Sequence, residues 1–113
     1  MITIYHNNRC RKSREGLEIL GKSGKKYSVR EYLNDVPTKD ELKNILAILN
    51  INPIELIRKN ESIWKENYKN VTLTDDEIID AMIKYPKLIE RPIVINGEKA
   101  VIGRPPSKIL DII

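Results

Sequence analysis

The only cysteine in the chain, Cys10, stands in a sequence setting that favours a reactive thiol. It lies between a short apolar run at residues 2–5, which predicts a strand, and a segment at residues 13–20 that predicts a helix. Cys10 is therefore expected at the N-terminus of a helix, where unpaired backbone N–H groups favour an anion. Four positively charged residues surround it in the sequence, namely Arg9, Arg11, Lys12 and Arg14. Both features favour the thiolate, which is the nucleophilic form of cysteine.

The residues around Cys10 exclude several other roles for a lone cysteine. A dithiol redox site needs Cys-x-x-Cys, but Ser13 holds the second position, and a cysteine phosphatase loop needs arginine where this chain has Gly16. A metal site needs several ligands at close spacing, and His6 alone does not supply them. Free cysteine is usually buried and inert, but such charged neighbours make a poor core. Cys10 is thus predicted to be a nucleophile whose redox cycle is completed by an external thiol.

Two polar neighbours are candidates for supporting the thiolate. His6, the only histidine, could form a hydrogen bond within the loop or help to set the charge of Cys10, and a purely structural role fits equally well. Ser13 could donate a hydrogen bond to the sulfur from one helical turn further on, or it could satisfy the backbone of that turn. The residues alone leave these alternatives open.

The elements that must position Cys10 begin with a strand, a helix and a second strand. The helix is expected from about residue 11 to residue 22, with Leu17 and Leu20 facing the core and Gly24 as its stop. The second strand is expected at residues 26–31. Two strands joined through a helix form a parallel pair with a right-handed crossover.

The middle of the chain has the pattern of a block of helices. Residue pairs with capping-box spacing, at 38–41 and 74–77, each precede apolar residues at helical intervals. Between them, Asn52-Pro53 predicts a short helix that carries Arg58.

The end of the chain changes period and completes a recognisable order of elements. Residues 92–102 predict a hairpin with an Asn96-Gly97 turn, and residues 107–113 predict a final helix. The order is that of an α/β, thioredoxin-like fold: a four-stranded mixed sheet in a single domain of residues 1–113, with a helical insertion at about 33–90.

This fold would bring distant residues to Cys10. In a thioredoxin-like fold the loop after the first strand meets the turn before the third strand, which places Cys10 near Arg91 and Pro92. A proline before the third strand is characteristically cis in such folds. We therefore expect a cis Arg91–Pro92 bond, although only about 5% of X–Pro bonds are cis in general.

Composition limits the partners and the compartment. With 113 residues, 41% hydrophobic and 32% charged, the chain fits one globular domain, and no apolar run approaches the roughly 18 residues of a membrane helix. The net charge is +4. The only aromatic residues are one tryptophan and five tyrosines, and no basic run has aromatic residues interleaved with it, which argues against a groove for single-stranded nucleic acid. One cysteine cannot form an internal disulfide, and the N-terminal apolar stretch is too short for a signal peptide, so we expect a cytoplasmic protein.

Four short motifs follow one another over the whole chain. They are Tyr-His-Asn-Asn-Arg-Cys-Arg-Lys-Ser-Arg at 5–14, Leu-Ile-Arg-Lys-Asn at 56–60, Ile-Glu-Arg-Pro-Ile-Val at 89–94 and Gly-Arg-Pro at 103–105. Together, in order and in spacing, they resemble the glutaredoxin-coupled arsenate reductases, the ArsC family. Any one motif would be weak, but four in register over 113 residues are strong.

The resemblance implies an activity and a set of site residues. In that family the cysteine, here Cys10, attacks arsenate, and three arginines hold the oxyanion; they match Arg58, Arg91 and Arg104. Arginine suits this role because its planar fork makes charge-assisted, often bidentate hydrogen bonds. The resemblance also implies no bound cofactor, glutathione as co-substrate, and glutaredoxin as the partner that completes reduction to arsenite.

The motifs leave two alternatives open. A glutathione-dependent thiol oxidoreductase of the same family would use the same Cys10 with little arsenate turnover. Redox regulators of the Spx type, which bind RNA polymerase, resemble the family but typically carry Cys-x-x-Cys, which Ser13 interrupts. The family commonly has proline where Asn8 stands and a smaller residue where Arg11 stands, and both departures could change the substrate preference.

Overall fold

The computed structural model describes residues 1–113, and the chain divides into two compact units. One unit combines the two ends of the chain, Met1–Asp35 and Arg91–Ile113, and the other is the middle of the chain, Val36–Glu90. The middle unit occupies nearly the stretch that the sequence predicts as a helical insertion, about 33–90.

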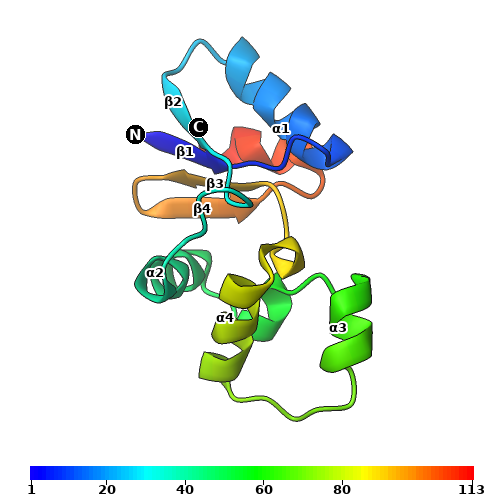
Figure 1. The fold of residues 1–113 in the computed structure, drawn as a ribbon. Coiled ribbons are helices and arrows are strands. Elements are labelled where there is room, and N and C mark those ends of the chain that lie inside the picture. The colour runs from blue at the N-terminus through cyan, green and yellow to red at the C-terminus, as the bar shows by residue number, and fades with distance from the viewer. The chain divides into compact units, whose positions relative to one another are not determined.

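The first unit is built on a four-stranded mixed sheet (Figure 1). Its strands are β1 (Ile2–Tyr5), β2 (Tyr27–Arg30), β3 (Ile93–Asn96) and β4 (Lys99–Ile102). The spatial order is β2-β1-β3-β4: β1 runs parallel to β2 and antiparallel to β3, which is antiparallel to β4. The predicted α/β, thioredoxin-like class, with one parallel pair and one hairpin, is confirmed.

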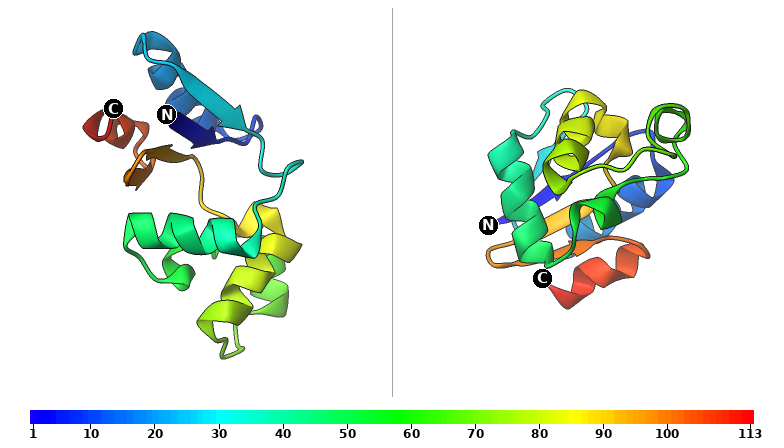
Figure 2. Two further views of the ribbon diagram at one scale, coloured as in Figure 1. Left: turned by 90° about the vertical axis from the view of Figure 1, so that its left-hand side faces the viewer. Right: turned by 90° about the horizontal axis from the view of Figure 1, so that it is seen from below.

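Two helices, α1 (Arg11–Lys22) and the 3₁₀ helix η3 (Pro106–Asp111), pack against each other beside this sheet (Figures 1 and 2). A Cβ on Gly16 would lie only 2.9 Å from Ile109 Cδ1 and 3.0 Å from Pro92 Cγ, so glycine lets α1 approach closely. Their shared core is built from buried apolar residues of both helices and of β1 and β3: Ile2, Ile4, Leu20, Val94 and Ile109.

The second unit consists of helices. They are α2 (Lys39–Leu49), η1 (Pro53–Leu56), α3 (Ser62–Asn67), α4 (Asp75–Lys84) and η2 (Pro86–Leu88). Both predicted capping boxes are confirmed: the Thr38 hydroxyl accepts the N–H of Glu41 at 3.1 Å, and the Thr74 hydroxyl accepts that of Glu77 at 3.2 Å. The core of this unit is formed by apolar residues buried on α2, on α4 and on the segments around them, including Leu42, Ile45, Leu46, Leu56, Trp64, Ile78, Ile79, Met82 and Leu88.

The short helix that was predicted to carry Arg58 ends before it. η1 stops at Leu56, and Ile57 forms an isolated antiparallel bridge with Ile89. The Arg58 N–H then donates to the Leu88 carbonyl at 2.7 Å. Pairing with a segment far along the chain therefore replaces the next helical turn, and Arg58 lies outside the helix.

Other differences are local. The final helix is a 3₁₀ helix at Pro106–Asp111. The hairpin loop falls one residue later than expected, because Asn96 still pairs with Lys99 and Gly97 takes the positive φ of 63°. No sequence signal predicts α3, which is six residues long and begins without a capping side chain. None of the helices combines the length and apolar character needed to cross a bilayer.

Candidate active site

Cys10 is the N-cap residue of α1, as its place in the sequence predicts. Its backbone is extended (φ −95°, ψ 122°), its N–H donates to the Asn7 carbonyl at 3.0 Å, and its carbonyl accepts the N–H of Arg14 at 3.0 Å. The side chain is partly buried. The loop thus turns sharply into the helix, and the sulfur faces the free N–H groups of the first turn.

The thiol of Cys10 has a lowered pKa. Partial burial raises the pKa, but the backbone N–H of Ser13, the hydrogen bond and charge of Arg91, and the backbone N–H of Lys12 together hold it below its ordinary value. At a given pH the thiolate fraction is therefore higher than for a cysteine with an ordinary pKa.

The four positively charged residues next to Cys10 in the sequence do not act on its thiol in the way that the sequence suggested. Their side chains are exposed, and Arg11 forms an ion pair with Glu15 at 3.1 Å. Arg14 Nη1 donates to the carbonyl of Asn8 at 3.0 Å, which braces the loop. The guanidinium that acts on the thiol is that of Arg91, which the fold brings from the other end of the chain.

Arg104 joins Arg91 at the thiol. Its Nη2 lies 3.8 Å from Cys10 Sγ, and its Nε donates to the backbone carbonyl of Arg91 at 2.9 Å. Two guanidinium groups therefore border one thiol, an arrangement able to hold a tetrahedral anion next to the sulfur.

The sheet explains how these two arginines meet. Each precedes a proline, Pro92 or Pro105, through a cis peptide bond; the first was predicted and the second was not. The Gly103 N–H donates to the Pro92 carbonyl at 2.8 Å, directly beyond the last pair of the β3–β4 hairpin. Arg91 and Arg104 thus stand at the same end of that hairpin.

A buried polar network supports the loop behind Cys10. His6 Nδ1 and Ser13 Oγ share a hydrogen bond of 2.7 Å, and the Asn7 N–H donates to the same oxygen at 2.9 Å. All three residues are buried. The Ser13 hydroxyl is therefore engaged by His6 and Asn7, and it is the backbone N–H of Ser13, not the hydroxyl, that lowers the pKa of Cys10.

Sequence reasoning missed two residues, Asn7 and Tyr32. Asn7 Oδ1 accepts the N–H of Arg9 at 3.0 Å, which adds a second brace to the loop. Tyr32 is fully buried just beyond β2, and the pKa of its hydroxyl is raised to about 12, first by burial, against the lowering effect of Arg91. Their position beyond the carboxyl ends of parallel strands β1 and β2 is the signal that could have found them, since sites in α/β sheets gather there.

Arg58, the third arginine of the predicted set, belongs to the second unit. Its guanidinium lies 3.5 Å from a carboxylate oxygen of Glu61 and 3.5 Å from one of Glu90. These two carboxylates balance part of its charge. Its role in holding an anion stays a prediction from the resemblance.

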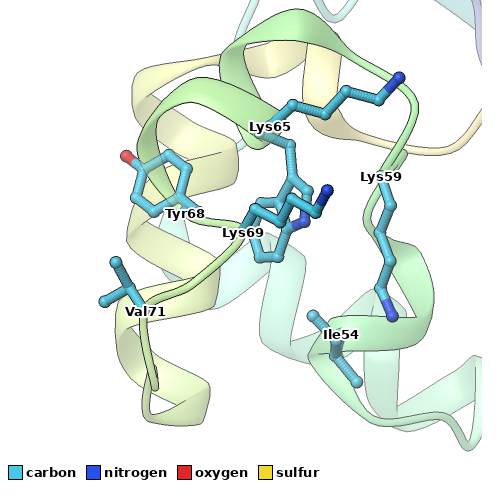
Figure 3. Close-up of a pocket in the computed structure, with 7 residues that line it drawn as sticks. Ile54, Lys59, Lys65, Tyr68, Lys69 and Val71 are labelled. Atoms are coloured by element: carbon cyan, nitrogen blue, oxygen red, sulfur yellow. The ribbon is translucent and has the colours of Figure 1, made fainter.

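The second unit also contains a hollow of about 390 Å³. Figure 3 shows lysine side chains bordering it beside α3. It is lined by Ile54, Lys59, Trp64, Lys65, Tyr68, Lys69 and Val71. The hollow offers positive charge from three lysines but no thiol, imidazole or carboxylate.

Known proteins are similar to this chain over almost its whole length. The profile described as ArsC family matches residues 5–112. A protein of Haemophilus influenzae named arsenate reductase is 40% identical, over 99% of this chain and 98% of its own length. The Escherichia coli K12 protein named uncharacterized protein YfgD is 43% identical, over 99% of this chain and 96% of its own. The solved arsenate reductase from Vibrio cholerae matches with a TM-score of 0.93 and 41% identity, covering 99% of this chain and 97% of that one.

Proposed function

Because this chain belongs to the ArsC family, we propose that it is an arsenate reductase, which reduces arsenate to arsenite through a covalent adduct on Cys10. The observation that carries the proposal is the position of Cys10: its pKa is lowered, and its sulfur is bordered by Arg91 and Arg104. The names of relatives that are about 40% identical supply the substrate.

The arginines address the main electrostatic obstacle to this reaction. A thiolate that attacks arsenate brings two negative groups together, so the site has to neutralise them. Arg91 and Arg104 supply two positive charges beside the sulfur, and charge-assisted hydrogen bonds from their forks would hold the arsenate oxygens. Donors that are already in place before the anion arrives stabilise the charge that develops during attack.

The proposed reaction balances with two external thiols. Cys10 Sγ forms a bond to arsenic while one oxygen leaves as water, and arsenic is not yet reduced. The glutathione thiol then displaces a second oxygen, again as water. A glutaredoxin thiolate next attacks the glutathione sulfur; the arsenic–sulfur electron pair goes to arsenic, which becomes As(III), and a glutathione–glutaredoxin mixed disulfide forms. Water then releases arsenite and frees the Cys10 thiol.

The external thiols are needed because of what stands beside Cys10. The position that would hold a second thiol is Ser13, whose hydroxyl is held by His6 and Asn7. Cys10 is the only cysteine, so the chain has no pair of thiols that could supply two electrons by forming an internal disulfide.

A steady-state assay of arsenite formation with glutathione and glutaredoxin tests the proposal. We expect the wild-type protein to be active only when both thiols are present, and a folded Cys10→Ser variant to be inactive. Arg58→Ala, Arg91→Ala and Arg104→Ala should each lower kcat/KM, whereas Arg9→Ala, which removes an exposed cation of the same loop, should not. Arsenate reduction by Cys10→Ser would defeat the proposal.

A further inference from the structure

The Tyr32 hydroxyl makes no hydrogen bond of good geometry within the chain, although the side chains of Asn7 and Arg91 lie close enough to act on it. The side chain is 0% exposed, and its Oη is closed off from solvent without a donor or acceptor at bonding geometry. Buried polar groups in folded proteins almost always have a partner, because leaving one unsatisfied costs stability. Phenylalanine at this position would keep the ring and remove only the hydroxyl.

The backbone places Tyr32 beside the Cys10 loop. Strands β1 and β2 end together, with Tyr5 paired to Arg30, and the His6 N–H donates to the Arg30 carbonyl at 2.9 Å. One residue further, Glu31 accepts a hydrogen bond of 2.7 Å from the Asn8 side chain. Tyr32 follows directly, so its ring enters the unit where the loop turns toward Cys10.

The groups that act on the hydroxyl belong to the site. Burial raises the pKa of Tyr32 to about 12, Arg91 and the Asn7 side chain act to lower it, and Cys10 raises it further. The hydroxyl therefore lies within the fields of both Cys10 and Arg91. It also keeps its proton throughout the physiological range, so it is a permanent neutral donor.

We infer that the Tyr32 hydroxyl donates a hydrogen bond to an oxygen of the tetrahedral anion that is drawn in against Cys10 and Arg91. The inference rests on the proposed function, because that function supplies the anion. An anion oxygen would provide the acceptor that the free protein lacks, in a place shielded from water where such a bond is strong. Tyr32 thereby adds a neutral donor to the two guanidinium groups and favours an oxyanion over an uncharged disulfide at the same sulfur.

Tyr32→Phe tests this role, with Tyr27→Phe as a matched control. Tyr27 stands at the opposite end of β2, where it pairs with Ile2, so its hydroxyl is remote from Cys10. The measurement is the arsenate concentration that protects Cys10 from alkylation by iodoacetamide, a neutral reagent. We expect Tyr32→Phe to need roughly tenfold more arsenate or more, as for a lost hydrogen bond to a charged group, and Tyr27→Phe to match the wild type.

Two further measurements distinguish a role of the Tyr32 hydroxyl in anion binding from a role in stability. Without arsenate, the alkylation rate of Tyr32→Phe should match that of the wild type, and its Tm should not fall below that of Tyr27→Phe, because no partner in the chain is lost. Equal protection of Tyr32→Phe and wild type would overturn the inference while leaving arsenate reduction intact. A lower Tm with unchanged protection would also overturn it, because the hydroxyl would then be structural. If arsenate does not protect even the wild type from alkylation, the anion site of the proposed function is contradicted, and the inference about Tyr32 is overturned with it.

Discussion

Arg104 donates its Nε–H to the backbone carbonyl of Arg91 at 2.9 Å while its Nη2 lies 3.8 Å from Cys10 Sγ. One arm of the fork is anchored on the chain, and the other faces the thiol. This geometry fixes the guanidinium before any anion arrives. The two arginines therefore have different roles. Arg91 lowers the pKa of the thiol, and the backbone carbonyl of Arg91 holds Arg104 in position.

Replacing Arg104 with lysine should therefore impair catalysis although the charge is kept. A lysine ammonium is a single point donor and cannot both bond the Arg91 carbonyl and face Cys10. We expect Arg104→Lys to lower kcat/KM for arsenate roughly ten- to hundredfold, the range for a lost hydrogen bond to a charged group. Arg11→Lys, at an exposed position, is the control, and unchanged kinetics in Arg104→Lys would show that the fork is not needed.

Replacing Arg91 should change the pH dependence of Cys10. Arg91 lowers the pKa through a hydrogen bond and through its charge, and its loss leaves the raising effect of burial less opposed. In Arg91→Ala the alkylation rate of Cys10 should therefore rise with pH along a curve shifted to higher pH, with slower alkylation at neutral pH. The wild-type curve should lie at lower pH than that of the same thiol without Arg91. Coincident curves for the wild type and Arg91→Ala would contradict the role of Arg91 in lowering the pKa of Cys10.

Ser13 should matter more for stability than its single hydroxyl suggests. Removing that oxygen leaves both the His6 ring and the Asn7 N–H without their buried partner. We expect Ser13→Ala to lower the free energy of unfolding by about 2 kcal/mol or more in urea titrations, since each unsatisfied buried group costs about 1–3 kcal/mol. Ser107→Ala, at an exposed position, should change stability little, and equal stability of the two variants would mean that the network is dispensable.

Two glycines should respond in opposite directions to the same substitution. A Cβ on Gly103 would lie 2.9 Å from Pro92 Cγ and 3.3 Å from Ile109 Cδ1, so Gly103→Ala should cost about 1–3 kcal/mol by overpacking. It should also lower activity, because Pro92 and Arg104 flank the site. At Gly21 a Cβ would meet only Tyr27 Oη, at 3.7 Å, and Gly21→Ala should stabilise α1 by up to about 1 kcal/mol. Thermal unfolding of the two variants checks both signs.

Local signals in the sequence predicted most of the fold. The capping boxes at Thr38 and Thr74 and the Gly24 stop depend only on near neighbours, and the structure contains each of them. The end of η1 could not be read in this way, because it is set by the bridge from Ile57 to Ile89. That pairing depends on the folded arrangement of distant segments.

In the candidate site too, some features follow from the sequence and others are set by the packed structure. The place of Cys10 at a helix N-terminus follows from the order of adjacent elements, and the nearness of Arg91 follows from the fold class. The direction of each side chain does not: Arg11 turns to Glu15, and the Ser13 hydroxyl turns to His6. The direction of each side chain depends on the partners that the packed structure places near it, and these partners cannot be identified from the sequence alone.

In the proposed function, Cys10 is a single nucleophile that takes its reducing electrons from outside the chain. A single-turnover experiment tests it most directly, with the protein in excess over arsenate and arsenite quantified with and without added thiols. We predict stoichiometric arsenite from the wild type when glutathione and glutaredoxin are present, none when they are absent, and none from Cys10→Ser under either condition. Arsenite formed without added thiols, or formed by Cys10→Ser, would contradict the account.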